Sequence, residues 1–199
     1  MKEFFHKYSY SIVKMFLNQF GISVFGSVLA MATTSADNNT LTVIVSIAAV
    51  IFYLFLLYTM TWEIGAKDRI SVDTGKVKYS PCKGLLLSLI ANIPNLLIAI
   101  LFSIGFPFMG THTWAGNLCA FLKLALIIIE GMYLGLLTVI QVPYGGAMHP
   151  LNYFWWPYFL IVIPAMLTCW IAYYFGHKNI KFTSLFDYKD PNQNNAKKK

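Results

Sequence analysis

The sequence predicts an all-α integral membrane protein, a bundle of about five transmembrane helices. Four long runs contain no Asp, Glu, Lys or Arg, namely residues 15–36, 38–62, 84–122 and 131–177. The composition agrees, because 57% of the residues are hydrophobic and 12% are charged, whereas soluble domains carry about a quarter charged residues. The runs also lack period-two alternation, which favours helices over a barrel for crossing a hydrocarbon core about 30 Å thick.

Five apolar blocks of the chain are each long enough to cross a bilayer as a helix. They are residues 10–33, 41–63, 84–109, 118–141 and 154–176. We therefore expect a single polytopic transmembrane domain over residues 1–177. The remaining residues, 178–199, form a polar, Lys-rich tail whose last part we expect to be disordered.

The first block has two interpretations, a retained helix or a cleaved signal peptide. It follows a basic start, and Ala30-Met31-Ala32 fits the small-x-small pattern of a cleavage site. However, Asn18 and Gln19 interrupt its apolar region, and the small residues that follow suit close helix packing. These features favour a helix that is retained in the bundle.

The positions of Lys and Arg predict the orientation, because these residues are enriched in cytoplasmic loops. Segment 65–83 contains five of them, namely Lys67, Arg69, Lys76, Lys78 and Lys83. The loops at 33–40 and 110–117 contain none. The sequence therefore predicts a multi-pass protein of the cell membrane with a cytoplasmic N-terminus and a cytoplasmic basic loop at 65–83.

The tail conflicts with five crossings. It contains six lysines, and an odd number of crossings from a cytoplasmic N-terminus places them outside. An alternative topology has four crossings plus a re-entrant segment, which returns the tail to the cytoplasm. The fourth apolar block is the candidate for that segment, because it contains the charged residues Lys123 and Glu130.

Glu130 is the leading candidate for an intramembrane polar site. It lies near the middle of the fourth block, where an ionised carboxylate costs about 2.5–3.5 kcal/mol on insertion scales. Asn92 and Asn95 flank Pro94, which interrupts the third block and frees polar groups that can line a ligand site. The alternative role for these polar residues is structural, as hydrogen-bonding groups that fix helix contacts.

The basic loop is the candidate contact for a partner. Four of its residues, Lys67, Arg69, Lys76 and Lys78, are placed to contact a cytoplasmic protein or anionic headgroups. The sequence Asp73-Thr74-Gly75 favours a turn, so we expect a small β-hairpin within the loop. The alternative is that the basic residues act only as a topology signal.

Segment 144–156 also has two interpretations. It contains Gly145-Gly146, His149 and Pro150 among aromatic residues that favour the headgroup level of a bilayer. It is either a re-entrant loop that lines a cavity or a flexible connector, and the sequence favours the connector.

No residue pattern predicts catalysis, a cofactor or a metal site. The three cysteines lie in separate elements without CxxC spacing, and the four histidines form no ligand pair. Phosphate-binding loops and hydrolase motifs do not occur in the sequence. The net charge of +7 does not predict nucleic-acid binding, because basic cytoplasmic loops account for it.

We therefore expect a non-enzymatic protein of the lipid bilayer that acts through a membrane or cytoplasmic protein partner, as an accessory subunit of a membrane complex. The alternative is a small transporter or permease subunit that uses Glu130 and the break at Asn92 and Asn95 as its site. A third hypothesis is a membrane enzyme that acts on lipid. The third is the weakest, because the sequence lacks a convergent set of acid, base or metal-binding residues.

Overall fold

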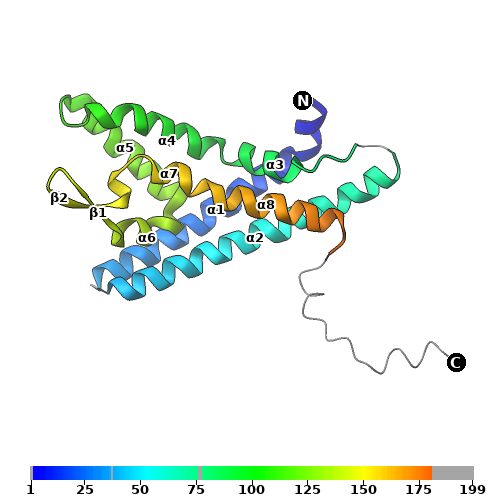
Figure 1. The fold of residues 1–199 in the computed structure, drawn as a ribbon, viewed down its shortest axis with the longest axis horizontal. Helices are drawn as coiled ribbons and strands as arrows, with labels where there is room; N and C mark the ends of the chain where they lie inside the picture. Colours follow the sequence, from blue (N-terminus) through cyan, green and yellow to red (C-terminus); the bar gives the residue numbers. More distant parts are fainter. Residues whose placement is uncertain (1, 37, 76–77, 181–199) are drawn as a thin grey trace, which may run out of the picture.

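The computed structural model describes residues 2–36, 38–75 and 78–180, and this part of the chain is a mostly helical bundle (Figure 1). Its elements are α1 (Lys2–Ser35), α2 (Asn39–Asp73), α3 (Lys83–Ala91), α4 (Ile93–Gly105), η1 (Phe106–Phe108), α5 (Thr113–Glu130), η2 (Gly131–Tyr133), α6 (Leu134–Val139), β1 (Gln141–Tyr144), β2 (Ala147–Pro150), η3 (Leu151–Tyr153), α7 (Pro157–Leu160) and α8 (Val162–His177). In this described part of the chain, four stretches of helix are long and apolar enough to cross a membrane, and the pair α3–α4 makes a fifth if it counts as one bent span. The expected all-α membrane bundle agrees with this architecture, whereas most of the predicted tail lies outside the described residues.

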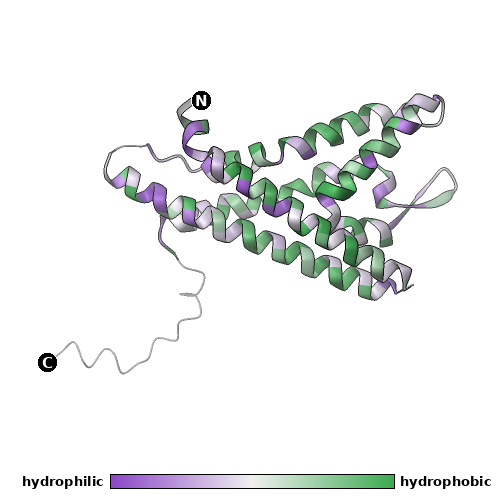
Figure 2. Ribbon diagram, turned by 180° about the vertical axis from the view of Figure 1, so that it is seen from behind, coloured by the Kyte–Doolittle hydropathy of each residue, from purple (hydrophilic) through white to green (hydrophobic). Residues whose placement is uncertain are grey.

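The two ends of the bundle differ in character. At one, which we call the basic end, the side chains of Lys7, Lys83 and Tyr173 all donate hydrogen bonds to Asp68, so the ends of α1, α2, α3 and α8 meet there. At the other, which we call the hairpin end, lie the α1–α2 turn, the α4–α5 connection and the β1–β2 hairpin (Figure 1). Figure 2 shows hydrophilic residues concentrated at the basic end and mostly hydrophobic helices between the two ends.

A bend of 57° separates α3 from α4 at Asn92. Pro94 stands in the first turn of α4, where its missing N–H removes no helical hydrogen bond, so this residue can begin a helix but cannot continue the preceding one. The predicted interruption of the third apolar block is therefore confirmed. Together α3 and α4 lead from Lys83 at the basic end to the α4–α5 connection at the hairpin end (Figure 1).

The segment α5–η2–α6 has the length of a membrane span, yet both of its ends lie at the hairpin end. In α5, Cys119 packs against the last residue of α4, whereas Glu130 is hydrogen bonded to Asn95 in the first turn of α4. Helix α5 therefore runs antiparallel to α4, from the hairpin end into the bundle. After η2, Gly135 packs against the first turn of α2, and Thr138 lines a hollow together with the last turn of α1. The chain thus turns back at η2 and leaves the bundle at the end where it came in.

The prediction of a loop at 65–83 is wrong for residues 65–73, which are helical. Helix α2 continues without interruption to Asp73, so the expected β-hairpin around that residue does not form. The helix extends because its buried face continues beyond the apolar block through Gly65 and Asp68, which lie against α8. Residues 76–77, which the hairpin would have included, lie outside the described part of the chain.

A different segment forms a hairpin. Strands β1 and β2 pair antiparallel, with Tyr144 opposite Ala147, and Gly145 and Gly146 between them. Both glycines have a positive φ, 60° and 83°, as a two-residue turn with two positive-φ central positions requires. Segment 144–156 is thus a connector between α6 and α7, as expected, but one with regular structure, part of a hairpin followed by η3. Its Gly-Gly pair was the local signal for the turn.

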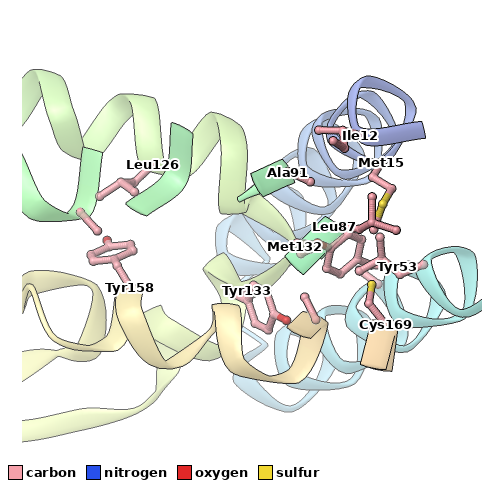
Figure 3. Close-up of a cluster of buried hydrophobic side chains, with 14 of the residues drawn as sticks. Ile12, Met15, Tyr53, Leu87, Ala91, Leu126, Met132, Tyr133, Tyr158 and Cys169 are labelled. Carbon is pink, nitrogen blue, oxygen red and sulfur yellow. The ribbon is translucent and has the colours of Figure 1, made fainter. Parts of the chain in front are cut away.

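The buried core joins the helices in the middle of the bundle. Figure 3 shows Tyr53 of α2, Leu87 of α3, Met132 of η2 and Cys169 of α8 close together in this core. Helix α3 packs closely against α8 at Gly84. A β-carbon at this position would collide with the α8 backbone, so the absence of a side chain permits the contact. Many side chains on the outside of the helices are large and apolar, as expected for a surface in contact with lipid.

Candidate intramembrane polar site

Glu130 is the last residue of α5 and lies where the folded-back segment reaches deepest into the bundle. Its backbone leaves the helical region, with φ −119° and ψ 18°, so α5 ends here. Gly131 follows because a side chain at this position would collide with the α1 backbone at Ser23. The Ser23 hydroxyl accepts a hydrogen bond from the Gly131 N–H and fixes the turn. The reversal of the chain therefore places Glu130 inside the bundle, where its side chain is only 3% exposed.

Two uncharged amides hold the Glu130 carboxylate. Gln19 Nε2 of α1 donates to Oε1 at 3.1 Å, and Asn95 Nδ2 of α4 donates to the same oxygen at 2.5 Å. Within the described part of the chain, no Lys, Arg or His forms an ion pair with this carboxylate. The surroundings thus supply hydrogen bonds to Glu130 but no neutralising charge.

The break between α3 and α4 supplies the other half of the site. Asn95 Nδ2 also donates to Asn92 Oδ1 at 2.8 Å, and Asn92 Nδ2 donates to the Ser88 carbonyl at 2.9 Å. All three side chains are buried. Ser88, Asn92 and Asn95 have the i, i+4, i+7 spacing of one helix face, and the bend at Asn92 keeps their side chains in contact. They form a hydrogen-bonded row from Ser88 to Glu130.

Two buried oxygens in this region find no hydrogen-bond partner among the described residues. They are Asn95 Oδ1, on the amide that holds Glu130, and Tyr133 Oη of η2. Buried polar atoms are paired in most structures, so an unpaired oxygen beside a carboxylate is a free ligand for a donor or a cation. Carboxylate, amide and hydroxyl oxygens suit a proton or a hard cation. In residues 2–36, 38–75 and 78–180 there is no group of three or more His, Cys, Asp or Glu that could hold a metal ion.

The structure brings together all three residues that the sequence singled out for an intramembrane site, Glu130, Asn92 and Asn95. Sequence analysis missed the roles of Gln19 and Ser88. Gln19 stood out as a polar interruption of the first apolar block. However, no local pattern relates it to a partner 111 positions further along the chain.

A second buried carboxylate, Asp68, lies at the basic end and was not predicted as a site. Lys7 Nζ donates to its Oδ1 at 2.7 Å, and Lys83 Nζ donates to its Oδ2 at 2.9 Å. The hydroxyls of Tyr8 and Tyr173 also donate to Oδ2, at 2.5 and 3.0 Å. Asp68 thus has two positively charged partners, and its hydrogen bonds connect α1, α2, α3 and α8. Sequence analysis placed Asp68 in a charged loop, and only the structure shows that it lies on the buried face of α2.

The predicted partner contacts converge on neither carboxylate. Lys67 and Arg69 each lie near an acidic residue one turn away on the surface of α2, at 3.9 and 3.7 Å. Beyond α2, Lys78 is exposed, and Lys76 lies outside the described residues. Lys67, Arg69 and Lys78 therefore form an exposed charged surface at the basic end.

No protein-family model, curated protein or solved structure matches this chain. The chemistry open to it follows from the two carboxylates. Glu130 has neutral hydrogen-bond donors and no counter-charge among the described residues, so its carboxylate can take up a proton or a small cation. Asp68 already carries two ammonium groups and can take up a further cation only by exchange.

Proposed function

We propose that this protein is a small, non-enzymatic transporter or permease subunit of the cell membrane, which moves a proton or another small monovalent cation by way of Glu130. The observation that carries the proposal is the position of this residue, where the folded-back segment α5–η2–α6 meets the break between α3 and α4. Non-helical backbone at membrane depth is tolerated where it is buried in protein or lines a cavity. Transporters with discontinuous helices bind their ions at such breaks.

The electrostatics of the site support the same conclusion. An ionised carboxylate near the middle of a membrane helix costs about 2.5–3.5 kcal/mol on insertion scales. The two amides that bond Glu130 reduce this cost but carry no net charge. A proton or monovalent cation neutralises the group, and the unpaired Asn95 Oδ1 offers the cation a second ligand. A site that lacks a permanent counter-charge binds such an ion reversibly, as transport requires.

The proposed topology has four crossings, α1, α2, α3–α4 and α7–α8, with α5–η2–α6 as a re-entrant segment from the outer side. The meeting of both ends of the folded-back segment at the hairpin end supports this arrangement over five crossings. It assigns the N-terminus, segment 65–83 and the tail to the cytoplasm. The enrichment of basic residues in cytoplasmic segments favours the same orientation.

Cysteine labelling in intact cells tests the topology. In a Cys82→Ser background, Thr113→Cys should react with a membrane-impermeant maleimide, whereas Thr74→Cys and Asn192→Cys should react only after the cells are permeabilised. Labelling of Asn192→Cys from outside would favour five crossings, and labelling of Thr74→Cys from outside would reverse the orientation.

Reconstituted vesicles test the function. The purified protein is placed in liposomes that contain a pH-sensitive dye, and a potassium diffusion potential is imposed with valinomycin. We expect proton uptake above the level of protein-free vesicles, or uptake of sodium in the corresponding isotope assay. Glu130→Gln should reduce this uptake to the protein-free level, because an amide cannot ionise, while its elution profile and thermal stability stay close to those of the native protein.

Glu63→Gln is the matched control, because Glu63 is an exposed carboxylate on α2. It should leave the flux unchanged. Equal flux in the Glu130→Gln variant and the native protein would refute Glu130 as the site. The absence of any cation flux with the native protein would refute the transport proposal as a whole.

A second proposal is an accessory role with a cytoplasmic protein partner. The last turns of α2 favour it, because Lys67, Arg69 and the strongly exposed apolar side chain of Ile70 lie together at the basic end. Affinity purification in mild detergent tests it. A stoichiometric partner should be lost when Arg69 and Ile70 are replaced by Ala, or when Lys76 and Lys78 are. If the partner co-purifies undiminished, the basic residues act as a topology signal.

A further inference from the structure

A line of buried polar side chains connects Glu130 with Asp68. From Glu130 it follows the hydrogen-bonded row of Asn95, Asn92 and Ser88, and Ser88 lies one turn beyond Gly84, which packs against the backbone of Cys169 in α8 next to that residue's thiol. From the other side of the same thiol, Thr61 Oγ1 of α2 donates to Cys169 Sγ at 3.4 Å. The line crosses the core and reaches the elements that hold Asp68.

The last part of the line follows two helices to the basic end. Tyr173 lies one turn beyond Cys169 on α8, and Asp68 lies two turns beyond Thr61 on α2. The Tyr173 hydroxyl donates to Asp68 Oδ2 at 3.0 Å. These polar side chains are all buried between α2, α3 and α8. The buried polar groups therefore extend from the middle of the bundle to its basic end.

Lys83 closes this line at the basic end. Its ammonium bonds Asp68 Oδ2 at 2.9 Å and approaches the Tyr8 hydroxyl at 3.4 Å, and its side chain is only 9% exposed. The other lysine on this carboxylate, Lys7, is 41% exposed and bonds Oδ1 from the outside. Oxygens of Asp68 and Tyr8 thus contact the Lys83 ammonium as they would contact a small cation, and the Tyr173 ring lies beside it, with its centroid 5.7 Å from Nζ.

We propose that Asp68 is a second cation-binding carboxylate on the path that begins at Glu130, and that the tethered ammonium of Lys83 fills it and seals the basic end in this structure. The proposal rests on the transport function and adds to it the exit site. The transported ion reaches the cytoplasmic side when it exchanges with the Lys83 ammonium. Its class is the same as at Glu130, a proton or a small monovalent cation.

Helix α3 links the two carboxylates mechanically. It is nine residues long, begins with Lys83 and ends just before the break at Asn92. The Asn92 side chain is hydrogen bonded to Asn95. A change in the occupancy of Glu130 therefore acts through Asn95 and Asn92 on the same short helix that carries the Lys83 ammonium. Short elements with a break at one end are the parts that move in hinge transitions.

Cys169 reports on the seal, because it lies on the line and is fully buried. All test proteins carry Cys82→Ser, because Cys82 is exposed and would react by itself. They retain the buried Cys119 near the hairpin end as an internal control. Purified protein in nanodiscs is treated with a water-soluble cationic methanethiosulfonate, and the modification of each thiol is measured by peptide mass spectrometry. Lys83→Met should raise the rate at Cys169 by about tenfold or more without raising the rate at Cys119, because it opens the basic end only.

Two variants sharpen the result. Lys83→Arg keeps a cation at Asp68 and should keep Cys169 protected, whereas Lys67→Met removes an exposed lysine and should have no effect. If Lys83→Met fails to elute as a monodisperse protein, Tyr173→Phe provides the test, since it removes one bond to Asp68 and leaves no unpaired cation. Unchanged protection of Cys169 in the variant tested, or an equal rise at Cys169 and Cys119, would overturn the proposal.

Cation dependence tests Asp68 as a binding site. In Lys83→Met at constant pH, sodium chloride should slow the modification of Cys169, because sodium refills Asp68, whereas N-methylglucamine chloride of equal ionic strength should not. Equal rates in the two salts would overturn the binding site for a small metal cation. None of these measurements uses transport, so they separate failure of the exit site from failure of Glu130→Gln to abolish flux.

Discussion

Glu130 and Asp68 are both almost fully buried carboxylates, but their partners differ in charge. Asp68 is bonded by two ammonium groups and two phenols, whereas Glu130 is bonded by two neutral amides. A buried carboxylate with a permanent counter-charge holds helices together and becomes very unfavourable when that charge is removed. One that has only dipolar partners keeps most of the cost of an unneutralised charge. The comparison separates a carboxylate that two tethered ammonium groups fill from a carboxylate that has no counter-charge among the described residues.

The largest expected effect is at the basic end. Asp68→Ala leaves Lys83 buried without its counter-charge, so we expect a loss of about 3–5 kcal/mol in the free energy of unfolding. Thermal unfolding of the purified protein, followed by tryptophan fluorescence, measures the loss. A change below about 1 kcal/mol, the size of a surface ion pair, would show that water reaches this pair and that the end is open.

Glu130→Leu should have an intermediate effect. Leucine removes the cost of inserting a carboxylate, but it leaves the amide donors of Gln19 and Asn95 without their acceptor, so we expect a net loss of about 1–3 kcal/mol. The same unfolding assay measures it. A stabilised but inactive variant would show that the carboxylate serves only the transported ion and contributes nothing to packing.

Glu130→Gln should change stability by less than about 1 kcal/mol, because the amide has nearly the same shape and can still accept a hydrogen bond from Asn95. Comparison with Asp68→Asn makes this informative. Asparagine at position 68 leaves two lysines without a negative charge and should cost clearly more. Equal losses in the two variants would remove the distinction between a carboxylate without a counter-charge and one that two lysines neutralise.

The smallest effect belongs to the exposed ion pairs of α2. Lys67→Ala should change the free energy of unfolding by about 0.3–0.5 kcal/mol, since its pair with Glu63 is exposed and one turn apart. Differential scanning fluorimetry measures the shift in unfolding temperature. The shift should appear at low salt and disappear at high salt, because salt screens an exposed ion pair. A larger loss would indicate that the surface of α2 near Lys67 is covered in the assembled protein.

The close correspondence between the predicted and observed breaks has a local cause. Pro94 removes a backbone donor, and Asn92 and Asn95 compete for backbone groups, so the interruption of the third block follows from neighbouring residues. The failure of the predicted loop at 65–83 has the opposite cause. Charged residues there suggested an end of the helix, but burial of Asp68 against α3 and α8 keeps α2 helical to Asp73.

The sequence by itself determined that this is a helical membrane protein with a broken third block and an unusual carboxylate, because apolar length, proline chemistry and the cost of Glu130 in lipid are properties of short segments. The tertiary structure decided the rest. The reversal at η2 depends on Gly131 fitting against α1, and the pairing of Glu130 with Gln19 depends on residues 111 positions apart. Contacts of this range arise only when the helices pack, since no local pattern fixes which buried polar groups must satisfy one another.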